Sequence, residues 1–462
     1  MRWEFVGGLV GALALGCGGG DDEPEVKRGP VTDPGTGLTV AACGMPAYAL
    51  LPSAEVGKLV SHEPDGLSYT PAGLDALVKL AKIKADPTPH GAKLFLFRYT
   101  TQAKGRAVEA TAMLAYPSGG APLPKDPPVV LWLHGTTGWS DACSPGANTN
   151  WQGMAAFLAG QGTIVVAPDF IGMNSHGDSS TVHHPYMVAE PTAIASWDAM
   201  PAAGEVLAQI GGGLALGKRV VIAGASQGGH ATLFTQRFGA YYAPEWEVVA
   251  QAAIVPASSV TAAFSRGVGK SPGATMVGLT AAMLVAARSW YGSPKSLSGV
   301  LTDSDPDHLA SRAEEIVFEG SCGSNQLSTA DPAQIYQPPF LEAARAGVPA
   351  LDPWGCYFGE SSIATTSNPA KKAAPTLYAV AENDELIPAP DNEPDVATLC
   401  AQGYSVQHLS CKGETHANGA LSSVPHALSF IRDRWAGKPM DAAATCKLNP
   451  PACCAGSTTC TP

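Results

Sequence analysis

Short apolar runs bounded by turn residues alternate with segments of helical spacing along the first half of the chain. The apolar runs lie at 128–133, 163–167, 219–223 and 248–255, and the helical segments at 151–160, 191–210 and 230–241. Two more strands are expected at 94–100 and 108–117, and short helices with Pro-rich turns at 41–90. Buried strands alternating with helices are typical of a doubly wound, mostly parallel sheet covered on both faces. The pattern therefore predicts an α/β protein.

The alternation stops after Pro256. The next 115 or so residues, 257–373, are rich in Ser, Gly and Ala and contain one long apolar helix, expected at 276–290. Strands are expected again at 375–380 and 404–409, and an amphipathic helix at 421–435. An insertion just before the last strands is typical of a lid over a site. A small domain with no role in access is the alternative.

These patterns divide the chain into a core, a largely helical cap and a tail. The core comprises 41–256 and 374–440, the cap 257–373, and the Cys-rich tail 441–462. Apolar residues at helical spacing usually form protein core, so the helix at 276–290 is expected to pack internally.

The N-terminus predicts export. Residues 1–17 contain a basic start and an apolar run too short to span a bilayer, and they end at Cys17. This arrangement resembles a bacterial lipoprotein signal, in which the cysteine is lipidated and attaches the protein to a membrane. An ordinary signal peptide, with Cys17 incidental, is the alternative. Residues 18–40 are Gly-, Pro- and Asp-rich and predict a disordered tether. We expect a cell-envelope lipoprotein or a secreted protein.

Cysteine usage supports the same compartment. Of 11 cysteines, ten remain once Cys17 is set aside, an even number that predicts disulfides in an exported protein. The expected partners are Cys400 with Cys411, Cys322 with Cys356, Cys43 with Cys143, and Cys446, Cys453, Cys454 and Cys460 among themselves. No cysteine spacing indicates a zinc site. The formal charge of −12 argues against nucleic-acid binding, which requires a basic face.

The run 220–234 carries the strongest chemical signal. An apolar strand ends in Gly224-Ala225-Ser226-Gln227-Gly228, and helix-forming residues follow. Strand, tight turn and helix in this order are the setting of a nucleophile elbow, in which a strained turn exposes the serine hydroxyl. Gly224, Gly228 and Gly229 leave room for the helix to pack against the strand.

A candidate acid and a candidate base follow the serine along the chain. Asp384 comes just after the strand at 375–380, where functional groups sit in doubly wound sheets; Glu382 and Glu385 are alternatives. His416 lies in a Gly-bounded loop between the last strand and the last helix. We expect it to accept the proton of Ser226. His408 and His426 are expected to be packing or surface residues.

An oxyanion hole needs two backbone N–H groups aimed at the developing negative charge. Gln227, directly after the serine, supplies one. The other is expected from the loop His134-Gly135-Thr136-Thr137-Gly138, with Thr136 as the donor and its two neighbours as alternatives. His134 and Asp169 are expected to have structural roles.

With these residues in place, the chain resembles the secretory lipase family and related bacterial esterases of the α/β-hydrolase superfamily. The resemblance covers roughly residues 90–436 and rests on segments 97–100, 134–143, 167–172, 184–190 and 197–199, including His184-Pro185-Tyr186. It implies an α/β-hydrolase fold with a cap before the acid-bearing strand, and hydrolysis of carboxylic esters, including acylglycerols. The Cys-rich tail departs from the family pattern, and the cap is matched poorly.

The expected function is therefore ester hydrolysis by Ser226, His416 and Asp384 through an acyl-enzyme, on a small-molecule or lipid ester. No metal or organic cofactor is expected. Acyl transfer or peptide hydrolysis by the same residues is the alternative, followed by a non-catalytic surface binding protein on a hydrolase scaffold.

Overall fold

The computed structural model describes most of the chain from residue 31 onward. The described residues are 31–33, 35–40, 43–46, 48–124, 127–293, 296–303, 308–320, 322, 327, 329–458 and 460. The predicted export signal, Cys17 and most of the predicted tether lie outside them. The end of the tether is ordered, contrary to prediction, because β1 (Val31–Thr32) and β2 (Thr39–Val40) pair in antiparallel. Leu38 between them is fully buried in the main core.

One mixed sheet organises the molecule, in the order β12-β11-β10-β9-β7-β8-β6-β5-β3, with β4 paired to β5. The strands are β3 (Leu59–His62), β4 (Leu67–Tyr69), β5 (Gly91–Ala103), β6 (Arg106–Ser118), β7 (Val129–Leu133), β8 (Ile164–Pro168), β9 (Arg219–Ala225), β10 (Glu247–Ile254), β11 (Thr376–Ala381) and β12 (Val406–Cys411). The six strands from β12 to β8 are parallel, and β6, β5, β4 and β3 are antiparallel. Every residue of β8 and β11 is buried, as expected for strands covered on both faces.

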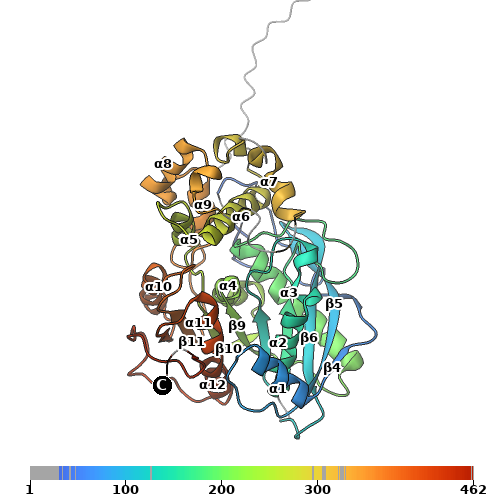
Figure 1. Cartoon of the computed structure of the whole chain (residues 1–462). Helices are drawn as coiled ribbons and strands as arrows, with labels where there is room; N and C mark the ends of the chain where they lie inside the picture. The colour runs from blue at the N-terminus through green and yellow to red at the C-terminus, as the bar shows by residue number, and fades with distance from the viewer. Residues whose placement is uncertain are drawn as a thin grey trace, which may run out of the picture.

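Helices cover both faces of this sheet (Figure 1). One face packs against α1 (Pro71–Leu80), α2 (Thr149–Gly160), α11 (His416–Ser422) and α12 (Val424–Trp435). The other packs against α3 (Ala189–Ile210), α4 (Gln227–Tyr242) and α10 (Ala389–Ala401). The doubly wound sheet predicted from the alternating pattern is confirmed. The strands β3 and β4 were not predicted, because their residues are half-buried or exposed and lack a clear alternation.

The strand order reverses at β7. The chain passes from β7 to β8 on one side, and then crosses to β9 on the other side of β7. Leu133 at the end of β7 is in register with Gly224 near the end of β9. In open α/β sheets, ligands bind outside the carboxyl ends of the strands at such a switch point. The loops after β7 and β9 therefore meet where a site is expected.

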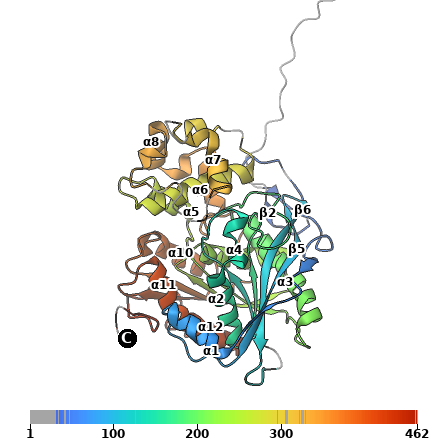
Figure 2. The same ribbon diagram turned by 45° about the vertical axis from the view of Figure 1, so that its right-hand side comes forward.

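The insertion between β10 and β11 forms a helical layer at one end of the sheet (Figures 1 and 2). Its helices are α5 (Val260–Gly267), α6 (Ala274–Tyr291), α7 (Leu309–Phe318), α8 (Pro338–Ala346) and α9 (Trp354–Glu360). The sequence predicted one of these five, α6, which is apolar on all sides. It packs internally as expected, because its apolar side chains are buried among the other helices. Among the described residues, no helix is long and apolar enough to cross a membrane.

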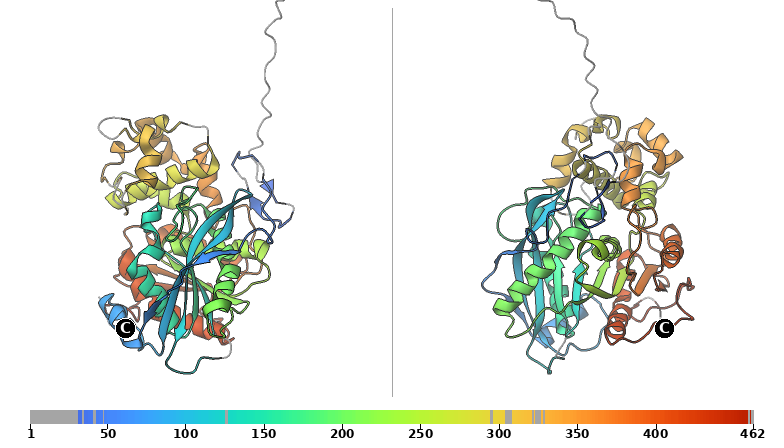
Figure 3. Two further views of the ribbon diagram at one scale, coloured as in Figure 1. Left: turned by 90° about the vertical axis from the view of Figure 1, so that its right-hand side faces the viewer. Right: turned by 180° about the vertical axis from the view of Figure 1, so that it is seen from behind.

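All ten cysteines in the described residues form disulfides, but most of the predicted pairs are wrong. The bonds are Cys43–Cys356, Cys143–Cys322, Cys400–Cys446, Cys411–Cys454 and Cys453–Cys460. Only the last joins two tail cysteines, as predicted; two others fasten the tail to the body. The first bond ties the insertion to the segment after β2, and the second ties it to the loop after β7. Figure 3 shows the segment that contains β1 and β2 beside the insertion. The spacing of the cysteines along the sequence did not predict these pairs, because the partners come together only in the tertiary fold.

Candidate active site

Ser226 occupies a sharp turn between β9 and α4. Its backbone lies at φ 59° and ψ −118°, a positive-φ conformation that is unfavourable for a residue with a side chain. The Ser226 N–H donates to the Ile254 carbonyl at 2.9 Å, and its carbonyl accepts from the His230 N–H at 3.1 Å. These bonds hold the strained turn, which is the geometry that the sequence predicted for this segment.

The three glycines around the serine are needed for close packing. A β-carbon at Gly224 would lie 2.5 Å from the carbonyl oxygen of Leu133, and one at Gly228 would collide with the same oxygen. A β-carbon at Gly229 would lie 2.8 Å from Pro256 Cα. Real β-carbons do not approach backbone atoms so closely, so only glycine lets α4 start against β7 and β10.

His416 and Asp384 reach the serine from the loops that follow the last two strands, β12 and β11. His416 is the first residue of α11, after β12, and Asp384 follows β11. The His416 ring places Nε2 2.9 Å from Ser226 Oγ and Nδ1 2.8 Å from Asp384 Oδ2. A carboxylate only accepts, so Nδ1–H donates to Asp384 and Nε2 is left to accept from the serine hydroxyl. The structure thus brings together the three residues proposed from sequence.

Asp384 is itself fixed by its own loop. Its Oδ1 accepts from the backbone N–H groups of Leu386 at 3.0 Å and Ile387 at 2.7 Å. Its side chain is 1% exposed and that of His416 is 10% exposed, so water is largely excluded from the contact between them. A hydrogen-bonded, buried carboxylate of this kind holds an imidazole in one tautomer and one orientation.

The alternative acids do not contact the imidazole ring. Glu385 Oε2 accepts from the backbone N–H of His416 at 3.0 Å, and Glu382 Oε2 accepts from that of Gly413 at 2.7 Å. Both side chains therefore shape the histidine loop. The other candidate histidines hold the tail, because His408 Nδ1 accepts from the Asn449 N–H and His426 Nε2 from the Ala455 N–H.

The backbone N–H groups of Gln227 and Thr136 lie in the segments expected to form an oxyanion hole. Gln227 is the first residue of α4, and Thr136 follows β7 in the loop that passes the elbow. Within the described part of the chain, neither N–H donates to another protein group. A β-carbon at Gly135 would lie 3.8 Å from Ser226 Cβ, so this loop runs beside the serine.

The segment His184-Pro185-Tyr186 supports both of these residues. His184 Nδ1 donates to the Ile171 carbonyl at 3.1 Å, which leaves Nε2 to accept from the Gln227 side-chain amide at 3.1 Å. Burial lowers the pKa of His184 to about 3, so the ring is neutral and suited to accept. The Tyr186 hydroxyl lies 2.9 Å from Thr136 Oγ1. The sequence marked this segment only through the family resemblance, without a role for either side chain.

His134 and Asp169 have the structural roles expected of them. Asp169 Oδ1 accepts from the Gly146 N–H at 2.7 Å, and Oδ2 accepts from the hydroxyls of Thr111 and Ser175 at 2.7 and 2.6 Å. Burial raises the pKa of this carboxyl to about 6. His134 bonds the Gly135 carbonyl at 2.7 Å, and burial lowers its pKa to about 4. Among the described residues, no group of three or more His, Cys, Asp or Glu side chains could hold a metal.

No protein-family model matches the sequence, and no curated protein matches it. Solved structures do resemble it. The rice cell wall degrading esterase LipA from Xanthomonas oryzae superimposes with a TM-score of 0.65 at 22% identity, covering 82% of this chain and 96% of that one. Candida antarctica lipase A in its closed state superimposes with a TM-score of 0.63 at 16% identity, covering 86% of each chain. The fold implied by the sequence resemblance is confirmed: the chain has the α/β-hydrolase fold.

Proposed function

We propose that this protein is an exported serine carboxylic-ester hydrolase of the lipase and esterase type. Ser226 is the nucleophile, His416 the general base and acid, and Asp384 the carboxylate that orients the imidazole. Gln227 and Thr136 supply the N–H groups of the oxyanion hole. The proposal needs no metal or organic cofactor.

The reaction follows from these roles. Ser226 Oγ attacks the ester carbonyl carbon while His416 Nε2 takes the hydroxyl proton, and the carbonyl π electrons move to oxygen as an oxyanion. The two N–H groups stabilise that charge. The intermediate collapses, the C–O bond to the alcohol breaks, and His416 protonates the departing alkoxide. Water, deprotonated by the same imidazole, then attacks the acyl-enzyme and releases the acid and free Ser226.

One observation carries the proposal: the His416 imidazole bridges Ser226 Oγ and Asp384 Oδ2 at 2.9 and 2.8 Å. Nucleophile, base and orienting acid in hydrogen-bonded sequence are the geometric signature of an activated serine. The strained elbow exposes the serine hydroxyl, and Gln227 and the loop after β7 supply the proposed oxyanion hole. Structural resemblance to an esterase and a lipase favours an ester over an amide as the substrate.

The direct test is turnover of p-nitrophenyl acetate together with labelling by a fluorophosphonate probe. Ser226→Ala should abolish both and keep the wild-type circular dichroism spectrum. Ser298→Ala, at an exposed serine of the insertion, is the matched control and should retain both. Turnover that survives in Ser226→Ala would refute the assignment. Amide substrates and alcohol acceptors, assayed alongside, would reveal peptide hydrolysis or acyl transfer instead.

Export and lipid attachment complete the proposal. Five disulfides in the described residues favour an oxidising compartment. The lipoprotein-like sequence ending at Cys17 supports membrane attachment through a lipidated cysteine. Metabolic labelling with a radioactive fatty acid should mark the wild-type protein and not Cys17→Ala. Equal labelling of the two proteins would exclude Cys17 as the anchor.

A further inference from the structure

The described part of the Cys-rich tail, residues 441–458 and 460, lies along the outer edge of β12, the last strand of the sheet. Carbonyl groups of alternate residues on that edge accept from the tail: Val406 from the Cys446 N–H at 2.7 Å, His408 from Asn449 Nδ2 at 2.6 Å, and Ser410 from the Ala452 N–H at 2.9 Å. An edge strand without such partners leaves its polar groups open to pairing with other chains. The tail therefore completes the sheet on the side that carries the proposed base.

A disulfide fixes the tail at the end of this strand. Cys411 is the last residue of β12 and pairs with Cys454, and both side chains are buried. The short loop 412–415 then connects Cys411 to His416, the first residue of α11. The tail is thus joined covalently to the start of the loop that leads to the proposed base.

Glu414 in this loop connects the tail to both the proposed base and the proposed acid. Its carboxylate accepts from the Ser457 hydroxyl, and both side chains are buried. Its backbone carbonyl accepts from the Asn383 N–H at 2.9 Å. Glu414 lies two residues before His416, and Asn383 lies directly before Asp384. A shift of Glu414 would therefore move the base and the acid relative to each other.

The tail also contacts the far end of α11. The Gly456 N–H donates at 3.1 Å to the carbonyl of Ser422, the last residue of that helix. A carbonyl at a helix C-terminus has no partner within the helix. A β-carbon at Gly456 would lie 2.6 Å from Ser422 Cα, so the tail passes this end of the helix in close contact. Two neighbouring tail residues, Gly456 and Ser457, therefore hold α11 at its end and just before its start.

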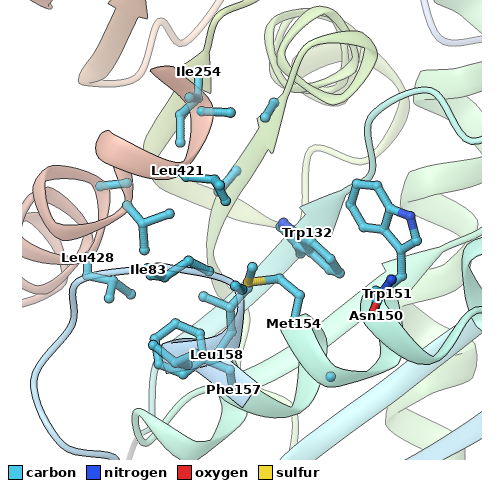
Figure 4. A pocket seen from close by; sticks show the side chains of 18 of the residues that line it. Ile83, Trp132, Asn150, Trp151, Met154, Phe157, Leu158, Ile254, Leu421 and Leu428 are labelled. Atoms are coloured by element: carbon cyan, nitrogen blue, oxygen red, sulfur yellow. The ribbon is translucent and has the colours of Figure 1, made fainter. Parts of the chain in front are cut away.

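Side-chain packing alone leaves part of α11 without support. One side of the helix packs on β11, where a β-carbon at Gly419 would lie 2.5 Å from Ala381 Cβ. Ala420 and Leu421 instead line an apolar pocket of about 560 Å³, and Figure 4 shows Leu421 among the side chains around this space. An open space of this size removes the contacts that a packed interior would provide. The contacts at the two ends of α11, where the tail binds, therefore contribute much of the restraint on its position.

We propose that the tail positions His416 for proton transfer, and that Ser457 is the positioning residue through which it acts, by holding the Glu414 carboxylate. The inference rests on the proposed function, because it concerns the placement of the proposed base in the same site. The His416 ring must stay 2.9 Å from Ser226 Oγ and 2.8 Å from Asp384 Oδ2. A misplacement of about 1 Å can cost about 100-fold in rate. A smaller shift of α11 should therefore lower kcat and leave substrate binding intact.

The test is hydrolysis of p-nitrophenyl acetate by full-length variants. Active sites are counted by complete labelling with the fluorophosphonate probe, so that a loss of folded protein cancels. Ser457→Ala should lower kcat per labelled site at least about fivefold and leave KM within about twofold of wild type. Ser457→Thr keeps a hydroxyl and should restore most of the loss. Thr458→Ala, at the exposed neighbouring residue, is the matched control and should reproduce the wild-type constants.

A double-mutant cycle tests the route through Glu414. If Ser457 acts through that carboxylate, Ser457→Ala should lower kcat no further in a Glu414→Ala background. A tail that only protects the sheet edge predicts a different result. Ser457→Ala would then lower the free energy of unfolding and leave kcat per labelled site within about twofold of wild type. That result would overturn the inference, and so would full multiplication of the two effects on kcat in the double variant.

A measurement without turnover separates failure of this inference from failure of the proposed function. The Nδ1–H of His416, which donates to Asp384, should give a low-field proton NMR signal that is absent in His416→Ala. This signal should shift or broaden in Ser457→Ala and stay unchanged in Thr458→Ala, even if the wild-type protein hydrolyses no ester. A signal that is the same in Ser457→Ala as in wild type would count against the tail as a positioning element.

Discussion

Asp384→Asn separates the proposed acid from its neighbours most sharply. Asp384 Oδ1 accepts from two backbone N–H groups, Leu386 and Ile387, and only an oxygen can continue to do so. The amide oxygen of the asparagine must therefore stay on that side. Its NH₂ group then faces His416 Nδ1 at the position where Oδ2 lay 2.8 Å away. Two donors cannot face each other, so the imidazole proton moves to Nε2.

This tautomer cannot accept the serine proton. Nε2–H would point at Ser226 Oγ, now 2.9 Å away, and general-base catalysis would be lost while the geometry survived. A wrong tautomer of this kind lowers kcat by about 10⁴-fold, or about 5 kcal/mol in the activation free energy. Stability should change little, because the side-chain volume and both backbone hydrogen bonds are kept.

The assay is steady-state hydrolysis of p-nitrophenyl acetate at pH 8, with a thermal melt of each variant. Glu382→Gln is the control, since its Oε2 bonds only the histidine loop at Gly413, and it should stay within about threefold of wild type. Glu385→Gln tests the other alternative acid. Asp384→Asn with more than a tenth of wild-type kcat would refute the reasoning. A collapse in Glu385→Gln at the same time would move the acid role to Glu385.

Three further predictions follow from individual contacts. Gly228→Ala should lose at least about 2 kcal/mol of unfolding free energy in urea titrations, because its β-carbon collides with backbone, whereas Gly273→Ala, with open space around it, should lose almost none. Tyr186→Phe removes the hydroxyl 2.9 Å from Thr136 Oγ1 and should lower kcat about three- to tenfold with little change in KM. An unchanged kcat would show that the Tyr186 hydroxyl does not help to position Thr136. Burial raises the pKa of Glu190 to about 7, so its contribution to stability is present below pH 4.5 and lost as pH rises through 7. The free energies of unfolding from urea titrations at pH 5 and pH 8 should therefore differ less in Glu190→Gln than in wild type, by at most about 3 kcal/mol. An equal pH difference in the two proteins would be contrary evidence.

Local chemistry explains what the sequence could predict. The strands from β7 to β11 are short apolar runs because both of their faces are covered. The residues of each run therefore indicate a buried strand without reference to the rest of the chain. The elbow is also local, since Gly224 and Gly228 are required by the turn that they flank. Asp384 and His416 could be proposed because residues that follow parallel strands share one edge of the sheet.

Long-range geometry explains what the sequence could not predict. Cys43 and Cys356 are 313 residues apart, and nothing near either one indicates the other. The support that His184 and Tyr186 give to the oxyanion residues depends on a loop folding back under the elbow. Their residue types suit many buried positions, so the hydrogen bonds become visible only in three dimensions.

The way the insertion is fastened bears on how a substrate enters. Besides its two chain connections, the insertion is held by Cys43–Cys356 and Cys143–Cys322, and the His230 ring, one turn after Ser226, donates to the Ser361 carbonyl at 2.8 Å. A layer fixed at several separate points cannot swing away as a rigid lid without breaking covalent bonds. Hydrolysis at Ser226 should therefore proceed without release of the insertion from the rest of the molecule.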